Sequence, residues 1–175
     1  MATGITTYSG RIHRGIVFKN ANDLWLAIGR TTPWTNETNP PVESESTTNL
    51  TELKGFRKIT NKSMCYTVSS GLGDINVLGQ DYKFCSDNDA YSNDARFVYL
   101  RGEIFNSDFI ENPTFSYRQI GIYSNLTPAT GHEGSLVLDP GYVTDNGVLE
   151  YYSNEQPIER RDDRNDVFEI VLEFL

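Results

Sequence analysis

The strongest structural signal in this sequence is a two-residue alternation along its last segment, residues 167–174. One set of alternate positions is entirely apolar, whereas valines and glutamates share the other set. Successive side chains of a β-strand point to opposite faces of a sheet, so this pattern predicts a strand. One face of that strand should be buried, and the other should be solvated or lie at an interface.

Shorter apolar or alternating segments recur along the chain, separated by residues that favour turns. The strands predicted from these segments cover residues 24–28, 64–68, 81–85, 96–104, 117–123, 136–138, 148–152 and 166–174. The sequence has neither an internal repeat nor the regular alternation of strands and helices that builds parallel sheets. It therefore predicts a mainly β fold, an antiparallel β-sandwich-like single domain that spans residues 1–175.

One or two short helices are expected beside the strands, and the best candidate covers residues 48–59. Leu50, Leu53 and Phe56 recur there at helical spacing. A threonine and an asparagine directly before Leu50 are suited to cap the first turn. Gly55 weakens this helix, because glycine is a poor helix former.

A long polar loop is predicted at residues 35–48, which are mostly Asn, Thr, Glu, Ser and Pro. Two consecutive prolines, Pro40 and Pro41, should make the middle of this loop stiff and extended. Trp34 directly precedes the loop, and we expect it to be half-exposed and to serve as an interface anchor. Trp25, within a predicted strand, is expected in the core.

The charge of the chain limits its partners. The 175 residues carry a net charge of −9, whereas proteins that bind nucleic acid need positive charge to neutralise phosphates. We therefore expect no nucleic acid as a partner. The apolar segments are far shorter than the roughly 20 residues of a membrane-spanning helix, and the first residues lack the basic and apolar regions of a secretory signal. We expect neither membrane insertion nor export.

Two cysteines, Cys65 and Cys85, are expected to be reduced and packed, because the sequence carries no export signal. A disulfide between them stays open as an alternative at this point.

No pattern in the sequence indicates a catalytic, cofactor or metal site. The histidines, His13 and His132, are not spaced as metal ligands, and neither a Gly-x-Ser-x-Gly segment nor a phosphate-binding loop occurs. Residues 87–91 begin like a calcium-binding loop, but the required glycine and the final glutamate are missing. A solvated acidic loop is the preferred interpretation. We therefore expect a protein that is not an enzyme and holds no cofactor.

Three segments, taken together, resemble a known family. Residues 26–34 combine a strand with Gly-Arg-Thr-Thr-Pro-Trp, residues 117–125 contain Tyr-Arg-Gln-Ile-Gly-Ile, and residues 150–158 contain Tyr-Tyr-Ser-Asn-Glu-Gln-Pro-Ile before the last strand. Similar segments occur in the same order in the baseplate wedge subunit of contractile-tailed, T-even-like bacteriophages, the gene-product-eight type. The sequence resembles a shortened form of that subunit, because it is considerably shorter, and residues 55–100 show no match to the large central insertion of the family.

This resemblance implies a structural role without catalytic residues. It implies a place in the virion, in the wedge of the tail baseplate, after assembly in the host cytoplasm. It also implies contacts with other baseplate wedge proteins, in a homodimer or a heteromeric assembly. The matched segments supply five interface candidates, which are Arg30, Trp34, Arg118, Tyr151 and Tyr152.

The first matched segment suggests how the polar loop is held. Gly29 is expected to let the backbone bend after the strand, and Arg30 is suited to pair bidentately with a carboxylate. Pro33 then fixes the direction of the chain. We expect Arg30 and Trp34 to pin the loop, either onto the body of the domain or onto a partner. The alternative is that Arg30 is simply exposed.

Two other functions remain open on the sequence alone. A carbohydrate-binding or receptor-binding tail module would also be rich in β-strands and exposed aromatic residues. A cell-wall glycan hydrolase would need two carboxylates in one cleft, and nothing in the sequence distinguishes such a pair among its acidic residues.

Overall fold

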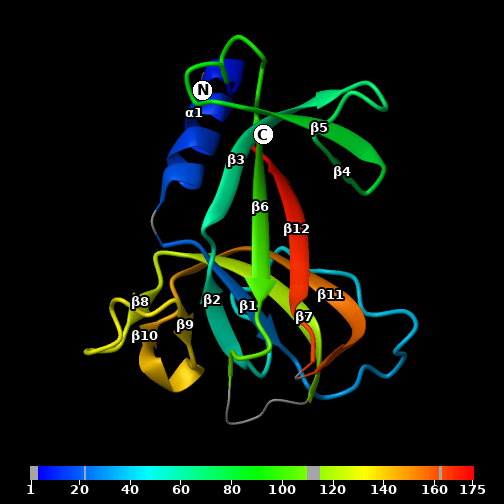
Figure 1. Ribbon diagram of the computed structural model, residues 1–175, viewed down its shortest axis with the longest axis vertical. Helices are drawn as coiled ribbons and strands as arrows, with labels where there is room; N and C mark the ends of the chain where they lie inside the picture. The colour runs from blue at the N-terminus through cyan, green and yellow to red at the C-terminus, as the bar shows by residue number, and fades with distance from the viewer. Residues whose placement is uncertain (1–3, 22, 110–114, 162) are drawn as a thin grey trace. The chain divides into compact units, whose positions relative to one another are not determined.

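The computed structural model describes residues 4–21, 23–109, 115–161 and 163–175. Its elements are β-strands of 2 to 13 residues, one α-helix and one 3-10 turn (Figure 1). In chain order they are α1 (Tyr8–Asn20), β1 (Trp25–Gly29), β2 (Gly55–Lys58), β3 (Asn61–Val68), β4 (Ile75–Val77), β5 (Gln80–Cys85), β6 (Phe97–Ile104), β7 (Phe115–Ser124), β8 (Thr127–Pro128), β9 (Val137–Leu138), the 3-10 turn η1 (Pro140–Tyr142), β10 (Val143–Asp145), β11 (Val148–Arg160) and β12 (Asp166–Glu173).

The prediction of a mainly β fold with antiparallel sheets is confirmed. The strand pairs of defined register are antiparallel throughout. Each predicted strand overlaps an observed one, while β2, β4, β8 and β10 were not predicted. In β12, Val167, Glu169 and Glu173 are exposed and the residues between them are more buried, as the alternation indicated.

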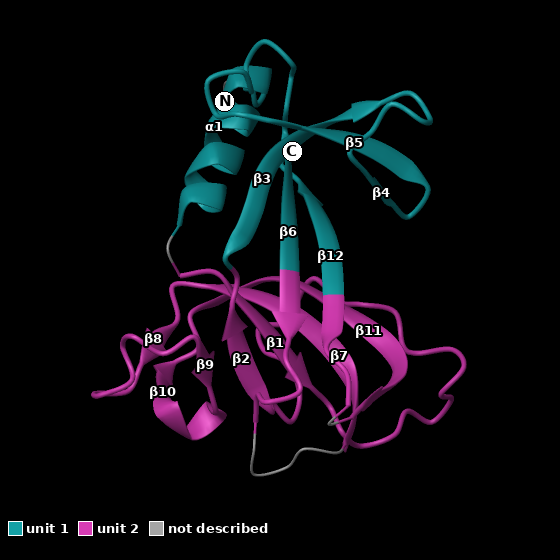
Figure 2. Cartoon of the chain, viewed as in Figure 1, with its two compact units in different colours: residues 1–22, 60–101, 168–175 teal, residues 23–59, 102–167 magenta. Residues whose placement is uncertain are grey.

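The chain forms two compact units, which Figure 2 colours separately. Unit 1 comprises Met1–Asn22, Thr60–Arg101 and Phe168–Leu175, and unit 2 comprises Asp23–Ile59 and Gly102–Val167. Strands β6 and β12 each contribute residues to both units.

Unit 1 is built on the strand order β12-β6-β3-β5-β4, with α1 against β3. Thr7 caps the helix by accepting a hydrogen bond from the Gly10 amide at 3.1 Å. Gly15 is buried, and a Cβ there would lie 3.1 Å from the end of Met64. The glycine therefore allows the helix to lie close to the strands, which stabilises a helix of poor intrinsic propensity.

The prediction of a helix at residues 48–59 is wrong. This segment forms a turn followed by β2, which pairs with β1 through Leu26↔Arg57 and Ala27↔Phe56. Leu50 and Phe56 are buried as expected, but they reach the core from a turn and a strand. Pairing with a central buried strand therefore overrides the weak helical pattern.

Unit 2 contains a sheet with the strand order β11-β7-β1-β2-β9 and a small pair of strands, β10 and β8. All five residues of β1 are buried, which explains its continuous apolar run. Trp25, only 2% exposed, lies in the core as predicted. The core cluster comprises Trp25, Ala27, Leu50, Phe56, Tyr123, Leu126 and Leu138.

Among the residues that the structure covers, no helix is both long and apolar enough to span a membrane.

Gly55, at the start of β2, is covered by the ring of Phe109. A Cβ at this position would lie 1.9 Å from a ring carbon of Phe109, so Gly55→Ala forces the ring to move. We expect the free energy of unfolding to fall by about 1–3 kcal/mol, the usual cost of overpacking. Urea unfolding monitored by circular dichroism measures the change.

Gly134→Ala is the matched control, because no atom lies within 4 Å of a Cβ at that position. Equal unfolding free energies for the two variants would contradict the observed packing of Phe109 on Gly55.

Candidate functional site

The candidate site is the surface of a long loop in unit 2, residues 30–54, which joins β1 to β2. The structure describes every residue of this loop, and none of them belongs to a helix or strand. The loop contains the polar stretch predicted at residues 35–48 and extends beyond it at both ends. Its shape depends on side chains that bind it to itself and to strands β7 and β11.

The bend at the start of the loop lies at Arg30 and not at Gly29. Arg30 has a φ of 52°, in the left-handed region that side chains rarely adopt. Its amide donates a hydrogen bond to the Thr51 carbonyl at 2.6 Å. Gly29 is needed for a different reason, because a Cβ there would lie 2.6 Å from the same carbonyl oxygen. The two ends of the loop are therefore in direct contact.

The Glu52 carboxylate closes the loop by binding Thr31 and Thr32. It accepts hydrogen bonds from the Thr31 amide and hydroxyl, both at 2.8 Å, and from the Thr32 amide and hydroxyl at 2.9 and 2.6 Å. Because these bonds favour the ionised form, they lower the pKa of Glu52 from 4.5 to about 2. The charge of Glu52 thus holds the start of the loop to its end.

Arg118 of β7 holds the middle of the loop. Its Nε and Nη2 donate three hydrogen bonds to the Glu37 carboxylate at 2.8–3.0 Å, and Nη1 donates to the Thr31 carbonyl at 2.7 Å. Arg118 is only 6% exposed, and its hydrogen bonds lower the pKa of Glu37. The bidentate carboxylate pair expected for Arg30 is therefore made by Arg118.

Trp34 is attached to β11. Its indole Nε1–H donates to the Glu155 carbonyl at 2.9 Å. That carbonyl is free to accept because the pairing of β11 with β7 shifts register between Asn154 and Ile158. Trp34 is 9% exposed, so the prediction of a half-exposed ring is wrong.

The Arg30 guanidinium lies over the Trp34 ring, 3.8 Å from its centroid. The two residues expected to pin the loop are thus in contact with each other. Trp34 binds the body of unit 2 directly, and Arg30 is placed against Trp34. Whether either residue touches a partner stays a prediction.

Strand β11 binds the second half of the loop through Tyr152 and Asn154. The Tyr152 hydroxyl lies 3.0 Å from the Thr47 hydroxyl. The Asn154 amide donates to the Glu43 carboxylate, and its side-chain nitrogen donates to the Pro41 carbonyl, both at 2.9 Å. The loop is therefore attached along its length to the edge strand of the sheet.

The structure brings four of the five interface candidates to this loop, namely Arg30, Trp34, Arg118 and Tyr152. Tyr151 lies on β11, and burial raises the pKa of its hydroxyl. Among the described residues, no hydrogen bond joins the Tyr151 side chain to the loop. The sequence gives no signal for the roles of Glu37, Glu43 and Glu52 in holding the loop, because nothing in their spacing indicates their distant partners.

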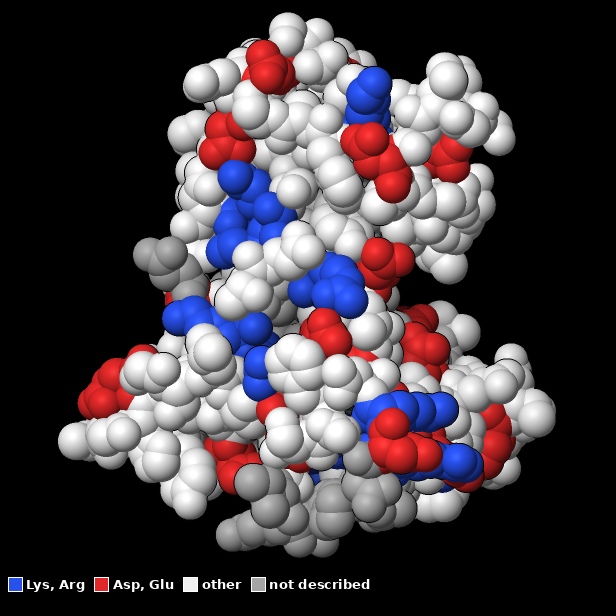
Figure 3. Space-filling view, in the orientation of Figure 1, with Lys and Arg blue, Asp and Glu red and all other residues white. Residues whose placement is uncertain are grey.

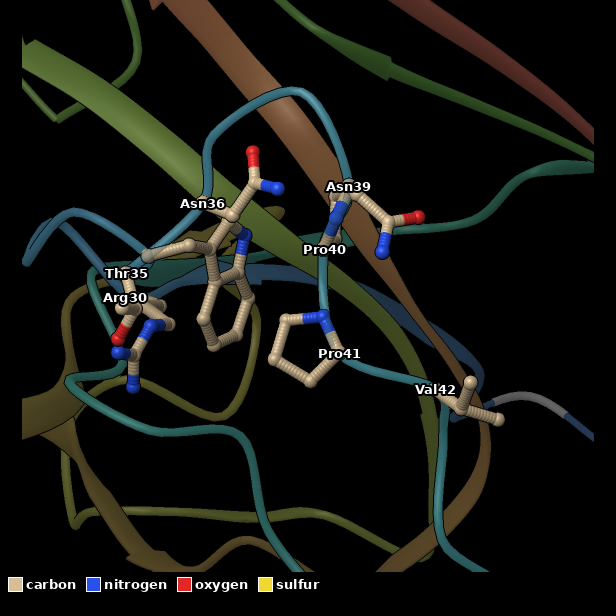
Figure 4. A pocket seen from close by; sticks show the side chains of 8 residues that line it. Arg30, Thr35, Asn36, Asn39, Pro40, Pro41 and Val42 are labelled. Atoms are coloured by element: carbon tan, nitrogen blue, oxygen red, sulfur yellow. The ribbon is translucent and has the colours of Figure 1, made fainter.

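A surface pocket of about 340 Å³ opens at the start of the loop. Figure 4 shows the Arg30 guanidinium at one end of this pocket and Pro41 and Val42 at the other. The lining residues are Arg30, Trp34, Thr35, Asn36, Asn39, Pro40, Pro41 and Val42.

Other groups considered in the sequence have local roles. Asp87, in the calcium-like segment, pairs with Lys19 at 2.7 Å, and Asp89 accepts a hydrogen bond from the Ser86 hydroxyl. Within the described part of the chain, no three His, Cys, Asp or Glu side chains are grouped to hold a metal ion. Cys65 and Cys85 are free thiols, and burial raises the pKa of Cys65 to about 12.

A sequence model of the family described as "Baseplate wedge 3 tail fiber network component" matches residues 1–174. The chain belongs to this family. It is also 35% identical over 164 residues to Virion protein 3 of Enterococcus phage phiEF24C, an alignment that covers 91% of this chain and 88% of that protein. The baseplate component is therefore a structural protein of a phage virion, located in the tail.

The family confirms the predicted structural role in a phage baseplate. On the face shown in Figure 3, acidic side chains of the baseplate component lie beside basic ones. The narrower resemblance to the gene-product-eight subunit of T-even-like phages stays a prediction.

The closure by Glu52 predicts sensitivity of the loop to acid. Because the pKa of Glu52 is lowered on folding, its charge stabilises the fold above about pH 4.5, and this stabilisation is lost as the pH falls toward 2. Glu52→Gln should lower the melting temperature at neutral pH and reduce its fall between pH 4.5 and 2. Thermal melting followed by circular dichroism over this range measures both effects.

Glu45→Gln is the control, because Glu45 is an exposed glutamate of the same loop with no hydrogen bond or ion pair in the described structure. A pH profile of Glu52→Gln identical to that of Glu45→Gln would show that Glu52 does not close the loop.

Proposed function

We propose that this protein is a scaffold subunit of the baseplate wedge and joins neighbouring baseplate proteins through the surface of the residue 30–54 loop. In this proposal residues 1–175 act as one module, which assembles in the host cytoplasm as a homodimer or within a heteromeric complex. The matched family, whose description names a wedge and a tail fibre network, supports the proposal.

The observation that carries this proposal is the attachment of an irregular loop along its whole length. Arg118, Trp34 and Tyr152 each bind it to the sheet of unit 2. Ordering a free loop upon binding reduces affinity, whereas a loop already held in one conformation avoids most of that cost. A fixed polar surface of this kind suits a permanent contact between subunits.

A carbohydrate-binding module is the second candidate function. The pocket favours it in one respect, since a tryptophan lies beside the side-chain amides of Asn36 and Asn39. However, Trp34 is 9% exposed and Arg30 covers part of its ring, which leaves little aromatic surface for a sugar to stack on. Hydrolysis of cell-wall glycans has less support, because no Asp or Glu is among the residues lining this pocket.

The test of the scaffold function is assembly with neighbouring baseplate proteins from the same phage. Sedimentation velocity of the purified proteins, alone and mixed, should show a stable heteromeric complex. Arg118→Gln leaves the Glu37 carboxylate without its main partner, so the loop loosens and the complex should weaken by about tenfold or more.

Arg161→Gln is the matched control, since it removes the same charge from a side chain that is 56% exposed and not among the pocket-lining residues. Circular dichroism of both variants checks that they fold. The proposed function fails if the wild-type protein forms no complex with any neighbouring baseplate protein. The role of the loop fails if Arg118→Gln binds as tightly as Arg161→Gln.

A further inference from the structure

We infer that the pocket at the start of the residue 30–54 loop binds the carboxylate of an Asp or Glu side chain from a neighbouring baseplate protein. This inference rests on the proposed scaffold function and names the chemistry by which the partner is recognised. Three features of the pocket carry it, which are its charge, its unused hydrogen-bond donors and its rigidity.

The charge of the pocket is opposite to that of the chain. The protein carries a net charge of −9. Among the residues lining the pocket, the one charged side chain is the cationic Arg30. A guanidinium in a site that no acidic side chain lines attracts an anion from outside, whereas the rest of an acidic surface repels it.

The guanidinium of Arg30 donates no hydrogen bond to any residue that the structure describes. Its Nε is buried and lacks a hydrogen-bond partner, and no carboxylate of the described residues forms a salt bridge with it. Glu37 interacts electrostatically with Arg30, but Arg118 already binds both of its carboxylate oxygens. The terminal nitrogens, Nη1 and Nη2, are not among the buried atoms and have no acceptor among the described residues, so they are the donors that an incoming carboxylate can reach.

The neighbouring amides supply further donors. The Asn36 Oδ1 already accepts hydrogen bonds from the Thr38 amide and hydroxyl at 3.1 and 2.9 Å. Its NH2 group is therefore the part left to interact with a ligand, and that group can only donate. Asn39 lies across the same pocket (Figure 4). Further donors beside the Arg30 guanidinium suit a carboxylate, which accepts hydrogen bonds only.

The guanidinium lies on a side chain that is itself held in place. Its central carbon is 3.8 Å from the centroid of the Trp34 ring, and Trp34 donates a hydrogen bond to the Glu155 carbonyl. Pro40 and Pro41, on the other side of the pocket, have restricted backbones. An arginine fork that is already oriented loses little side-chain entropy when it binds a carboxylate bidentately.

The test is an NMR titration of the whole protein with a small probe, N-acetyl-glutamic acid α-amide, whose only charge is the side-chain carboxylate. We expect saturable shifts of the Arg30 Nε–H and Trp34 Nε1–H signals. The signal of Trp25, which lies in the core, should stay in place. The corresponding glutamine probe, neutral and almost identical in shape, should produce no shift.

Three variants complete this experiment. Arg30→Gln should abolish the shift of the Trp34 signal, Arg30→Lys should reduce it because an ammonium lacks the planar fork, and Arg161→Gln should leave it unchanged. Arg30→Gln should also weaken the heteromeric complex, whereas Arg161→Gln should not.

Each alternative result overturns the carboxylate inference. The first is an equal shift of the Trp34 signal with the glutamate and glutamine probes, and the second is no shift at a saturating concentration of the glutamate probe. The third is a shift produced only by N-acetylglucosamine oligomers, which would instead indicate a sugar site. Failure of the inference is separable from failure of the scaffold function. If the complex forms equally well with Arg30→Gln and the probe does not bind, the scaffold function stands and the pocket has no part in it.

Discussion

The ion pair between Arg118 and Glu37 is the interaction on which the shape of the residue 30–54 loop depends. Arg118 projects from β7 and uses all three of its guanidinium nitrogens, two on Glu37 and one on the Thr31 carbonyl. A buried arginine without these acceptors would be strongly destabilising. Arg118 can therefore stay buried on β7 only while the loop keeps this conformation. The stability of the sheet and the shape of the loop thus depend on each other.

Strand β11 supplies the remaining hydrogen bonds to the loop. In an edge strand only the backbone groups that face the neighbouring strand enter the ladder, and the Asn154 amide, which faces the other way, donates to Glu43. Between Asn154 and Ile158 the pairing with β7 shifts register, and there the Glu155 carbonyl accepts the indole N–H of Trp34. A local break in the strand pairing thus fixes Trp34, which in turn places Arg30 beside the pocket.

The sequence predicted the strands well and the contacts of the loop poorly, for a physical reason. Apolar and polar side chains alternate along residues 167–174 because successive residues of a strand face opposite sides of a sheet. Strand β12 shows this alternation in the burial of its side chains. The helix α1 was missed because it contains two glycines, and its stability comes from packing of Gly15 against strands distant in sequence. Among the loop residues, Arg30 and Trp34 were identified from a resemblance, whereas Glu37 and Glu52 were not, since their partners are fixed only by the fold.

At position 30, the backbone conformation and the charge of the pocket favour different residues. Such a conformation costs a non-glycine residue about 1–3 kcal/mol, so the isolated subunit would gain stability from glycine or asparagine at position 30. The charge of the pocket, however, is supplied by arginine alone. If the pocket binds a carboxylate of a partner as inferred above, selection for a more stable free protein and selection for assembly act in opposite directions at position 30.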